Sequence, residues 1–256
     1  MERVTFTNSR NLKLVGNFHP SSSRSVIIMC HGFTSDKSSR GRFDRFSSAF
    51  QAIGYSVLAF DFSGCGESDD DALTLAKMVD DLHAAISFVQ AKGFSQIALY
   101  GHSLGCRVCL SAYSPTISTM VLSGAGTGPV NYDWNEHFTA EQMNELAESG
   151  RITEHLQSGP RQTLIIDRQM LLDFADFDQE KLLSSVKCPV LIIHGDSCWE
   201  EKLLSSITEQ GMRWLPSTSK LAIVEGAEHN FMRHLQIVEQ LACDWYREHF
   251  PLQENV

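Results

Sequence analysis

The chain has 256 residues, enough for one large α/β domain or two small ones, and its 43% apolar content allows a sizeable core. Its 31 acidic side chains outnumber 21 basic ones, so the formal net charge is −10. Nucleic acid and anionic membranes both require concentrated positive charge, so this balance argues against either as a partner.

The apolar pattern, taken in chain order, predicts strands that alternate with helices. Residues 2–8 and 12–19 alternate between apolar and polar side chains and form an expected opening pair of strands. Continuous apolar runs, typical of strands buried on both faces, are present at 25–32, 55–62, 95–103, 119–125, 189–196 and 220–227. Helical spacing is present at 44–54, about 72–92, 104–114, about 198–210 and 229–250. This alternation predicts the α/β class, with a mostly parallel, twisted sheet covered by helices on both faces.

Residues 126–186 interrupt the alternation. The segment has no buried-strand run, but it contains short amphipathic helices such as AEQMNELAESG and DRQMLLDFA. We therefore expect a core formed by residues 1–125 and 187–256, with 126–186 inserted as a mainly helical lid. We expect apolar side chains to line this lid, among them Trp134, Phe138 and Leu172.

The seven cysteines are scattered, and most stand inside apolar runs. Cys106 and Cys109 form a lone C-x-x-C, which we interpret as buried core thiols rather than a metal or redox site. The first residues, MERVTFTNSR, lack the apolar run of a secretory signal, and no apolar stretch is long enough to span a bilayer. We therefore expect a reduced, cytoplasmic protein.

The stretch GHSLG, residues 101–105, is a G-x-S-x-G motif between a predicted strand and a predicted helix. A sharp, strained turn there lifts the Ser103 hydroxyl above the edge of the sheet, and the small glycines let neighbouring backbone pass close. The backbone N–H of Leu104 then lies at a helix N-terminus, where it can face developing negative charge. In this context the motif indicates a nucleophilic serine rather than an ordinary helix cap.

A second motif, HGF at residues 31–33, follows another predicted strand. The backbone N–H of Phe33 is a candidate second donor to the same negative charge. We interpret His31 as a structural histidine that holds the shape of the loop.

A third motif, EGAEHNF at residues 225–231, places a histidine after the last predicted strand. A serine hydroxyl is a poor nucleophile without a base in hydrogen-bond reach, and His229 is the predicted base. His102 lies in the serine turn itself and His194 inside a strand end, so both are interpreted as structural.

Together HGF, DFSGCGES, GHSLG, PVLIIHGD and EGAEHNF resemble the α/β-hydrolase family, in family order over nearly the whole chain. The nearest resemblance is to lidded bacterial carboxylesterases of the cinnamoyl/feruloyl esterase type. It implies an α/β-hydrolase fold with Ser103 as nucleophile and His229 as base. It also implies an oxyanion hole, the pair of donors that holds the negatively charged oxygen of the intermediate, formed by the amides of Phe33 and Leu104. No cofactor is implied.

The acid that such a site requires is not at its usual position. The family usually reads H-G-x-x-D, and that position is Cys198 here, whose thiol cannot orient an imidazole as a carboxylate does. In an extended chain Asp196 and Glu200 point to the same side as Cys198, so both remain candidates.

Local helix signals separate these two candidates. Ser197 and Glu200 have the S-x-x-E spacing of a capping box, which would occupy Glu200 with the backbone N–H of Ser197. Asp196 would then be the last residue of the strand and face the cleft. We predict Asp196 as the acid, while Glu200 and the absence of any acid remain open; Glu228 is too close to His229 in the chain to bend back to its ring.

These motifs predict a serine hydrolase that cleaves a small-molecule carboxylic ester through an acyl-enzyme intermediate. A thioesterase, an amidase or a cofactor-free perhydrolase would carry the same motifs. A catalytically impaired hydrolase fold kept for binding is the alternative from another class. The sequence specifies neither the natural substrate nor the oligomeric state.

Overall fold

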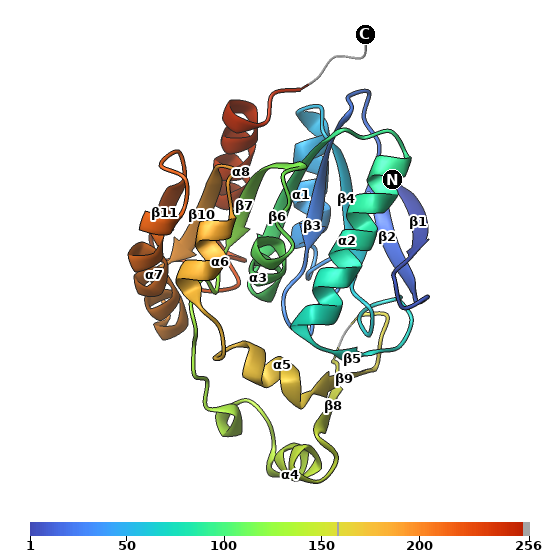
Figure 1. Cartoon of the computed structure of the whole chain (residues 1–256), viewed down its shortest axis with the longest axis vertical. Helices are drawn as coiled ribbons and strands as arrows, with labels where there is room; N and C mark the ends of the chain where they lie inside the picture. Colours follow the sequence, from blue (N-terminus) through green and yellow to red (C-terminus); the bar gives the residue numbers. More distant parts are fainter. Residues whose placement is uncertain (158, 253–256) are drawn as a thin grey trace.

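An eight-stranded sheet forms the centre of the computed structural model, which describes residues 1–157 and 159–252 (Figure 1). Ser158, within the predicted insertion, and residues 253–256, at the end of the predicted core, lie outside the described residues. The sheet order is β1-β2-β4-β3-β6-β7-β10-β11. The strands are β1 Glu2–Thr7, β2 Lys13–His19, β3 Ser25–Cys30, β4 Ser56–Asp61, β6 Gln96–His102, β7 Ile117–Ser123, β10 Val190–Gly195 and β11 Lys220–Val224.

The predicted α/β class with a mostly parallel sheet is confirmed. β1 pairs antiparallel with β2 and β2 antiparallel with β4, whereas all neighbours from β4 to β11 are parallel. Every residue of β3, β4 and β10 is buried, because helices cover both faces of a parallel sheet. This explains why these strands are continuous apolar runs in the sequence.

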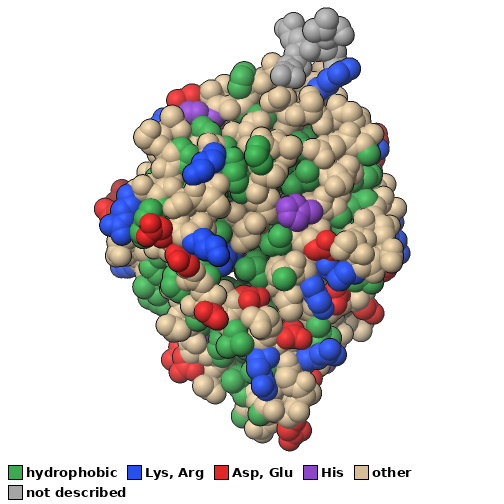
Figure 2. Space-filling view, in the orientation of Figure 1, with side chains coloured by type: hydrophobic (Ala, Val, Ile, Leu, Met, Phe, Trp, Pro, Cys, Tyr) green, Lys and Arg blue, Asp and Glu red, His purple; other side chains and the backbone are tan. Residues whose placement is uncertain are grey.

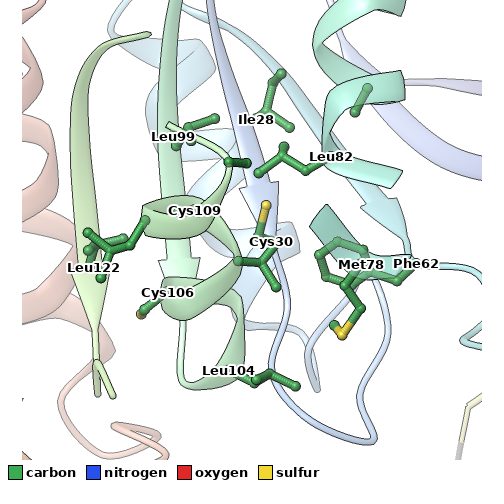
Figure 3. Close-up of a cluster of buried hydrophobic side chains, with 14 of the residues drawn as sticks. Ile28, Cys30, Phe62, Met78, Leu82, Leu99, Leu104, Cys106, Cys109 and Leu122 are labelled. Carbon is green, nitrogen blue, oxygen red and sulfur yellow. The ribbon is translucent and has the colours of Figure 1, made fainter. Parts of the chain in front are cut away.

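Alternate residues of a strand point to opposite sides of the sheet, so the buried side chains form two hydrophobic clusters, one on each face. Different helices pack against each cluster. α2 (Leu75–Ala91) and α3 (Leu104–Ser111) pack on one side. α1 (Arg42–Ala52) and α8 (Leu235–His249) pack on the other. Figure 3 shows the first cluster, in which side chains of α2 and α3 meet those of the strands, among them Met78, Leu82, Cys109, Ile28, Leu99 and Leu122.

Most of the chain between β7 and β10, here called the β7–β10 segment (residues 124–189), lies beyond one end of the sheet, whereas its last helix, α6 (Gln179–Ser185), lies beside the sheet next to α3 (Figure 1). Before α6 it contains η1 Trp134–Glu136, α4 Ala140–Ser149, β8 Arg151–His155, β9 Thr163–Asp167 and α5 Arg168–Asp173. The helices expected from AEQMNELAESG and DRQMLLDFA are α4 and α5. β8 and β9 were not expected; they join β5 (Ala72–Leu73) in a three-stranded sheet. Their five-residue runs are only partly buried, so they carry a weak apolar pattern.

The carboxyl ends of the parallel strands meet at the edge of the sheet that faces this segment (Figure 1). The loops after β3, β6, β10 and β11 therefore converge there, and α7 (Trp199–Gly211) with η2 (Met212–Trp214) follows β10. Acidic and basic side chains are interspersed over the face shown in Figure 2, without a continuous patch of one sign. Among the described residues, no helix combines the length and apolar character needed to cross a membrane.

Candidate active site

Ser103 stands at the turn between β6 and α3 in a strained backbone conformation, with φ 54° and ψ −124°. A side chain at either flanking glycine would collide with backbone. A Cβ on Gly105 would lie 2.0 Å from the carbonyl oxygen of Cys30, and one on Gly101 would lie 2.8 Å from Cα of Cys106. Positive φ at a non-glycine residue costs on the order of 1–3 kcal/mol and is retained where surrounding packing fixes it. The turn thus holds the Ser103 side chain at the carboxyl end of β6.

Three side chains from three separate segments form a continuous hydrogen-bonded chain at this edge of the sheet. Ser103 Oγ lies 2.9 Å from His229 Nε2, and His229 Nδ1 lies 2.5 Å from Glu201 Oε1. Ser103 follows β6, His229 follows β11, and Glu201 lies in the first turn of α7. The structure therefore brings together the predicted serine and histidine, and adds a carboxylate that was not among the sequence-based candidates.

The predicted contact between Asp196 and His229 is wrong. Asp196 Oδ1 instead accepts a hydrogen bond from the backbone N–H of Gly226 at 2.7 Å, which ties the loop after β10 to the loop after β11. The capping box predicted at Ser197 and Glu200 is also absent: α7 has Cys198 as its N-cap, without a side-chain cap. The Oε1 of Glu200 accepts from the Tyr132 hydroxyl at 3.0 Å, and its Oε2 stays 3.9 Å from His229 Nδ1.

Helix geometry explains why Glu201 occupies this position. The extended-chain argument assumed that alternate residues share a side, but α7 begins at Trp199, and each helical residue turns the direction by about 100°. The buried stripe of α7 consists of Glu201, Leu204, Thr208 and Gly211. In the structure Glu201 is fully buried. The signal in the sequence that could have identified Glu201 was an acid on the apolar stripe of a predicted helix, where charged residues are rare unless they have a partner.

A second histidine holds the other oxygen of Glu201. The Oε2 atom accepts hydrogen bonds from the Gly195 N–H at 2.7 Å and from His194 Nδ1 at 3.0 Å. Because an ionised carboxylate only accepts, His194 Nδ1 carries the proton in this contact, and Nε2 of the same ring lies 2.9 Å from the Thr208 hydroxyl. Thr208 in turn lies 2.9 Å from the Thr127 hydroxyl. His194 is thus structural, as predicted, but its partner is the carboxylate that contacts His229.

These contacts set the charges of the site. Burial raises the pKa of Glu201, but the hydrogen bonds from His194 and His229 outweigh it and bring the pKa to about 2, so the carboxylate is ionised. Burial lowers the pKa of His229, whereas the hydrogen bond to Glu201 and the charges of Glu200 and Glu201 raise it above its ordinary value. Arg42 acts in the opposite direction on His229.

Gly124, directly after β7, fits the His229–Glu201 contact closely. Its φ is 62°, a conformation that L side chains rarely adopt. A Cβ there would lie 2.9 Å from His229 Cε1 and 3.1 Å from Glu201 Oε1. The absence of a side chain at this position therefore makes room for the contact.

The loop after β3 lies against the serine. A Cβ on Gly32 would lie 3.2 Å from Cβ of Ser103, and Phe33 lines the same cavity as Ser103. Leu104 is the first residue of α3, so its N–H lies in the first turn of a helix, where N–H groups have no intrahelical partner. The Nε2 atom of His31 accepts from the Phe62 N–H, which leaves Nδ1–H to donate to the Gly32 carbonyl at 2.9 Å. That bracing is the structural role predicted for His31.

A cleft with an open space of about 410 Å³, mouth included, lies between Ser103 and the β7–β10 segment. Its lining includes Ser103 and His229 from the loops of the sheet, and Val130, Tyr132, Phe174 and Phe177 from the segment. Apolar side chains of the segment thus face the serine, but they are not the three expected. Leu172 is exposed, Phe138 is buried in the core, and Trp134 packs against Phe174 at a ring distance of 5.3 Å.

Comparison with known families places the chain among the hydrolases. Residues 21–236 match the family described as serine aminopeptidase, S33. The chain belongs to this family. The matched range contains Ser103, His229 and Glu201 together with the β7–β10 segment.

One curated relative is similar to part of this S33-family chain. It is a protein of Mycoplasma genitalium named "Putative esterase/lipase 2", 32% identical over 96 residues. The alignment covers 36% of this chain and 34% of the relative, so the chain spans about a third of the relative's length.

Solved structures share the fold over almost the entire chain. Est1E from Butyrivibrio proteoclasticus, solved with ferulic acid bound, has a TM-score of 0.74 at 19% identity, covering 96% of this chain and 98% of Est1E. A thermophilic esterase from Thermogutta terrifontis, solved with malate bound, has a TM-score of 0.72 at 19% identity, covering 97% and 100%. At these identities the likeness establishes the α/β-hydrolase fold, which confirms the predicted fold and resemblance.

Proposed function

We propose that this protein is a serine hydrolase that cleaves small-molecule carboxylic esters. The observation that carries the proposal is the hydrogen-bonded chain from Ser103 through His229 to Glu201, with contacts of 2.9 Å and 2.5 Å. A hydroxyl becomes a nucleophile when a base takes its proton, and the base is most effective when a third group fixes its tautomer. Glu201, rather than Asp196, is proposed as that third group.

The chemistry follows from these contacts. Ser103 Oγ attacks the ester carbonyl as His229 Nε2 takes its proton, and the ionised Glu201 stabilises the imidazolium that forms. His229 then gives the proton to the leaving alcohol, and an acyl group remains on Ser103. Water, activated by the same histidine, releases the acid and restores the serine.

The negative charge on the carbonyl oxygen of the intermediate needs donors. We assign these to the backbone N–H groups of Phe33 and Leu104, on the two loops that flank Ser103. Donors of this kind each contribute on the order of 10²–10³ in kcat. The close approach of the Gly32 backbone to Ser103 supports the first, and the start of α3 supports the second.

Residues 126–186 are proposed as a lid on a core of 1–125 and 187–256. Tyr132, Phe174 and Phe177 line the cleft above Ser103, and Phe33 packs against Phe174 at a ring distance of 5.7 Å. An apolar cover excludes water from the serine and strengthens the electrostatic interactions beneath it. The esterase names of the relatives support an ester as substrate, and Est1E was solved with a carboxylic acid, ferulic acid, bound.

The first experiment separates an esterase from the alternatives. The purified protein should cleave p-nitrophenyl butanoate and react covalently with a fluorophosphonate probe. Ser103→Ala should abolish labelling and lower turnover by about 10³-fold or more. Ser111→Ala, at an exposed position at the end of α3, is the matched control and should leave both unchanged.

The outcome also distinguishes the competing reactions. Matched butanoyl thioester and butanoyl anilide substrates, measured beside the ester, test thioesterase and amidase activity at the same serine. An S33-family aminopeptidase would cleave amino-acid anilides in preference to the ester. If the wild type neither reacts with the probe nor cleaves any of these substrates faster than buffer does, the protein is a hydrolase fold used for binding.

A further inference from the structure

Arg42, the first residue of α1, is a buried cation, and only 4% of the residue is exposed. Its Nε and Nη1 atoms have no hydrogen-bond partner among the residues that the structure describes. Burial lowers the pKa of Arg42, and the charge of Arg40 acts in the same direction. Leaving a buried charged group unpaired costs several kcal/mol, so such a group is retained where a partner arrives from outside.

Arg42 lines a cavity that also reaches the serine. Arg42 lines it together with Phe33, His102, Ser103, His229 and Asn230. Arg40 also contributes to the lining, and none of the residues that line this cavity is acidic. An anion in this space would meet a positive side chain without a competing carboxylate.

Arg107 in α3 is a natural comparison, because it is equally buried. It is 9% exposed, and its Nε and Nη1 atoms also lack partners in the described chain. Its guanidinium carbon, however, lies 3.1 Å from the ring centre of Phe177, and the cleft that it lines contains the carboxylate of Asp173. Arg107 thus has an aromatic face and a negative charge nearby, whereas Arg42 makes no cation–π contact or ion pair with the residues that the structure describes.

We infer that the Arg42 cavity binds a carboxylate carried by the ester substrate. The preferred substrates would then be esters with an anionic group on the part of the molecule that occupies this cavity. A carboxylate there would accept hydrogen bonds from a guanidinium that is already largely desolvated and whose Nε and Nη1 atoms have no partner among the described residues. This inference rests on the proposed ester hydrolysis at Ser103. The carboxylate could belong to the acyl or to the alcohol part, and two pairs of substrates separate these sources.

The test compares charged and neutral esters of the same length. For the acyl part, the pair is mono-p-nitrophenyl adipate and p-nitrophenyl hexanoate. For the alcohol part, the pair is 4-carboxyphenyl butanoate and 4-carbamoylphenyl butanoate. Within each pair, the ratio of kcat/KM values in a variant is divided by the ratio in the wild type, which cancels the intrinsic reactivity of the esters.

Arg42→Met keeps the length of the side chain and removes the charge. In one of the two pairs it should lower kcat/KM for the charged ester about 10- to 100-fold more than for the neutral ester. Arg42→Lys should restore part of that selectivity, since it keeps a charge without the planar fork. The matched control, Arg107→Met, should change both members of each pair by the same factor.

Binding without turnover gives a second measurement. Calorimetry with adipate on Ser103→Ala should show binding that is lost in the Ser103→Ala/Arg42→Met double variant. Circular dichroism melting checks that each variant is folded. If Arg42→Met is not folded, Arg42→Lys replaces it in both measurements.

Three results would overturn the inference. In the first, Arg42→Met lowers kcat/KM for the charged and the neutral ester of each pair by the same factor. In the second, Arg107→Met and not Arg42→Met lowers kcat/KM selectively for a charged ester. In the third, adipate binds the Ser103→Ala/Arg42→Met variant as well as it binds Ser103→Ala. If ester hydrolysis still depends on Ser103 in these cases, the proposed function stands and the anion site alone fails. Hydrolysis that is independent of Ser103 would instead remove the proposed function.

Discussion

The turn that carries Ser103 and the turn that carries Glu201 lie at the same edge of the sheet but are held in different ways. Sterics fix the β6–α3 turn: Ser103 has a positive φ, and Gly105 leaves no room for a side chain against Cys30. The β10–α7 turn depends on polar contacts, because both oxygens of Glu201 are occupied by N–H donors. The backbone thus determines where the serine lies. The position of the acid is determined by the face of α7 on which it stands and by its hydrogen-bond donors.

This difference explains how the acid can stand away from its usual place in the chain. A helix that starts at Trp199 rises only about 1.5 Å per residue, so Glu201 remains near the strand end although it is three residues beyond Cys198. His194 and Gly195, at the end of β10, then fix the carboxylate from behind. The serine cannot move along the chain in the same way, because a shift by one residue would place another side chain at the strained position of the β6–α3 turn.

The largest effect is expected from Glu201→Gln. Glu201 accepts from three N–H groups, those of His229, His194 and Gly195, but a glutamine has only one side-chain oxygen. Its NH₂ group would face His229 or the other two donors. Facing His229, it would impose the wrong imidazole tautomer, and kcat for p-nitrophenyl butanoate should fall by about 10⁴-fold.

Asp196→Asn is the matched control for that variant. This variant also removes one negative charge from the β10–α7 turn. The carboxylate of Asp196, however, accepts from the Gly226 N–H and does not contact His229. We expect its kcat to stay within a few-fold of the wild type. A larger loss in Asp196→Asn than in Glu201→Gln would show that Asp196, and not Glu201, acts on His229.

A substitution in the β6–α3 turn should lower the free energy of unfolding of the protein. In Gly105→Ala the new Cβ would lie 2.0 Å from the Cys30 carbonyl oxygen, so the backbone must move. Overpacking of this kind costs about 1–3 kcal/mol, and we expect a lower midpoint in urea unfolding together with lost activity. Gly126→Ala is the control for the unfolding midpoint, because a Cβ at Gly126 meets nothing within 4 Å and its φ, like that of Gly105, lies outside the left-handed region. Equal destabilisation of both variants would mean that the close approach to Cys30 does not decide the effect.

The sequence was sufficient for features fixed by the backbone. Buried strands are continuous apolar runs, and GHSLG needs its glycines for steric reasons, so the strand order along the chain and Ser103 could both be predicted. The acid could not be identified by counting along an extended chain, because the exact start of α7 decides which side chain faces His229. A difference of one residue in that start exchanges Glu200 and Glu201.

The same reasoning applies to the β7–β10 segment. Its helices have apolar residues at helical spacing and were expected, whereas β8 and β9 gain their stability by pairing with each other and with β5. That pairing joins residues far apart in the chain, such as Leu73 and Ile166. Periodicity within a short window does not contain this information, and the side chains that line the cleft could not be chosen from it either.

The smallest effect, and the one that tests how the two acids of α7 divide their roles, is expected from Glu200→Gln. Glu200 lies 3.9 Å from His229 Nδ1, and its charge contributes to a His229 pKa above the ordinary value. His229 must be neutral to take the serine proton, so activity rises as pH increases through that pKa. Removal of the Glu200 charge lowers the pKa of His229, and the acid limb of the kcat/KM profile should move to lower pH with little change in the plateau.

Tyr132→Phe distinguishes this charge effect from a packing effect. It removes the hydrogen bond to Glu200 Oε1 but keeps the carboxylate beside His229. Its acid limb should therefore not move to lower pH, whereas that of Glu200→Gln should. If Glu200→Gln instead lost its plateau activity as Glu201→Gln does, both acids would be needed to orient His229. The helix face alone would then not explain which carboxylate serves the histidine.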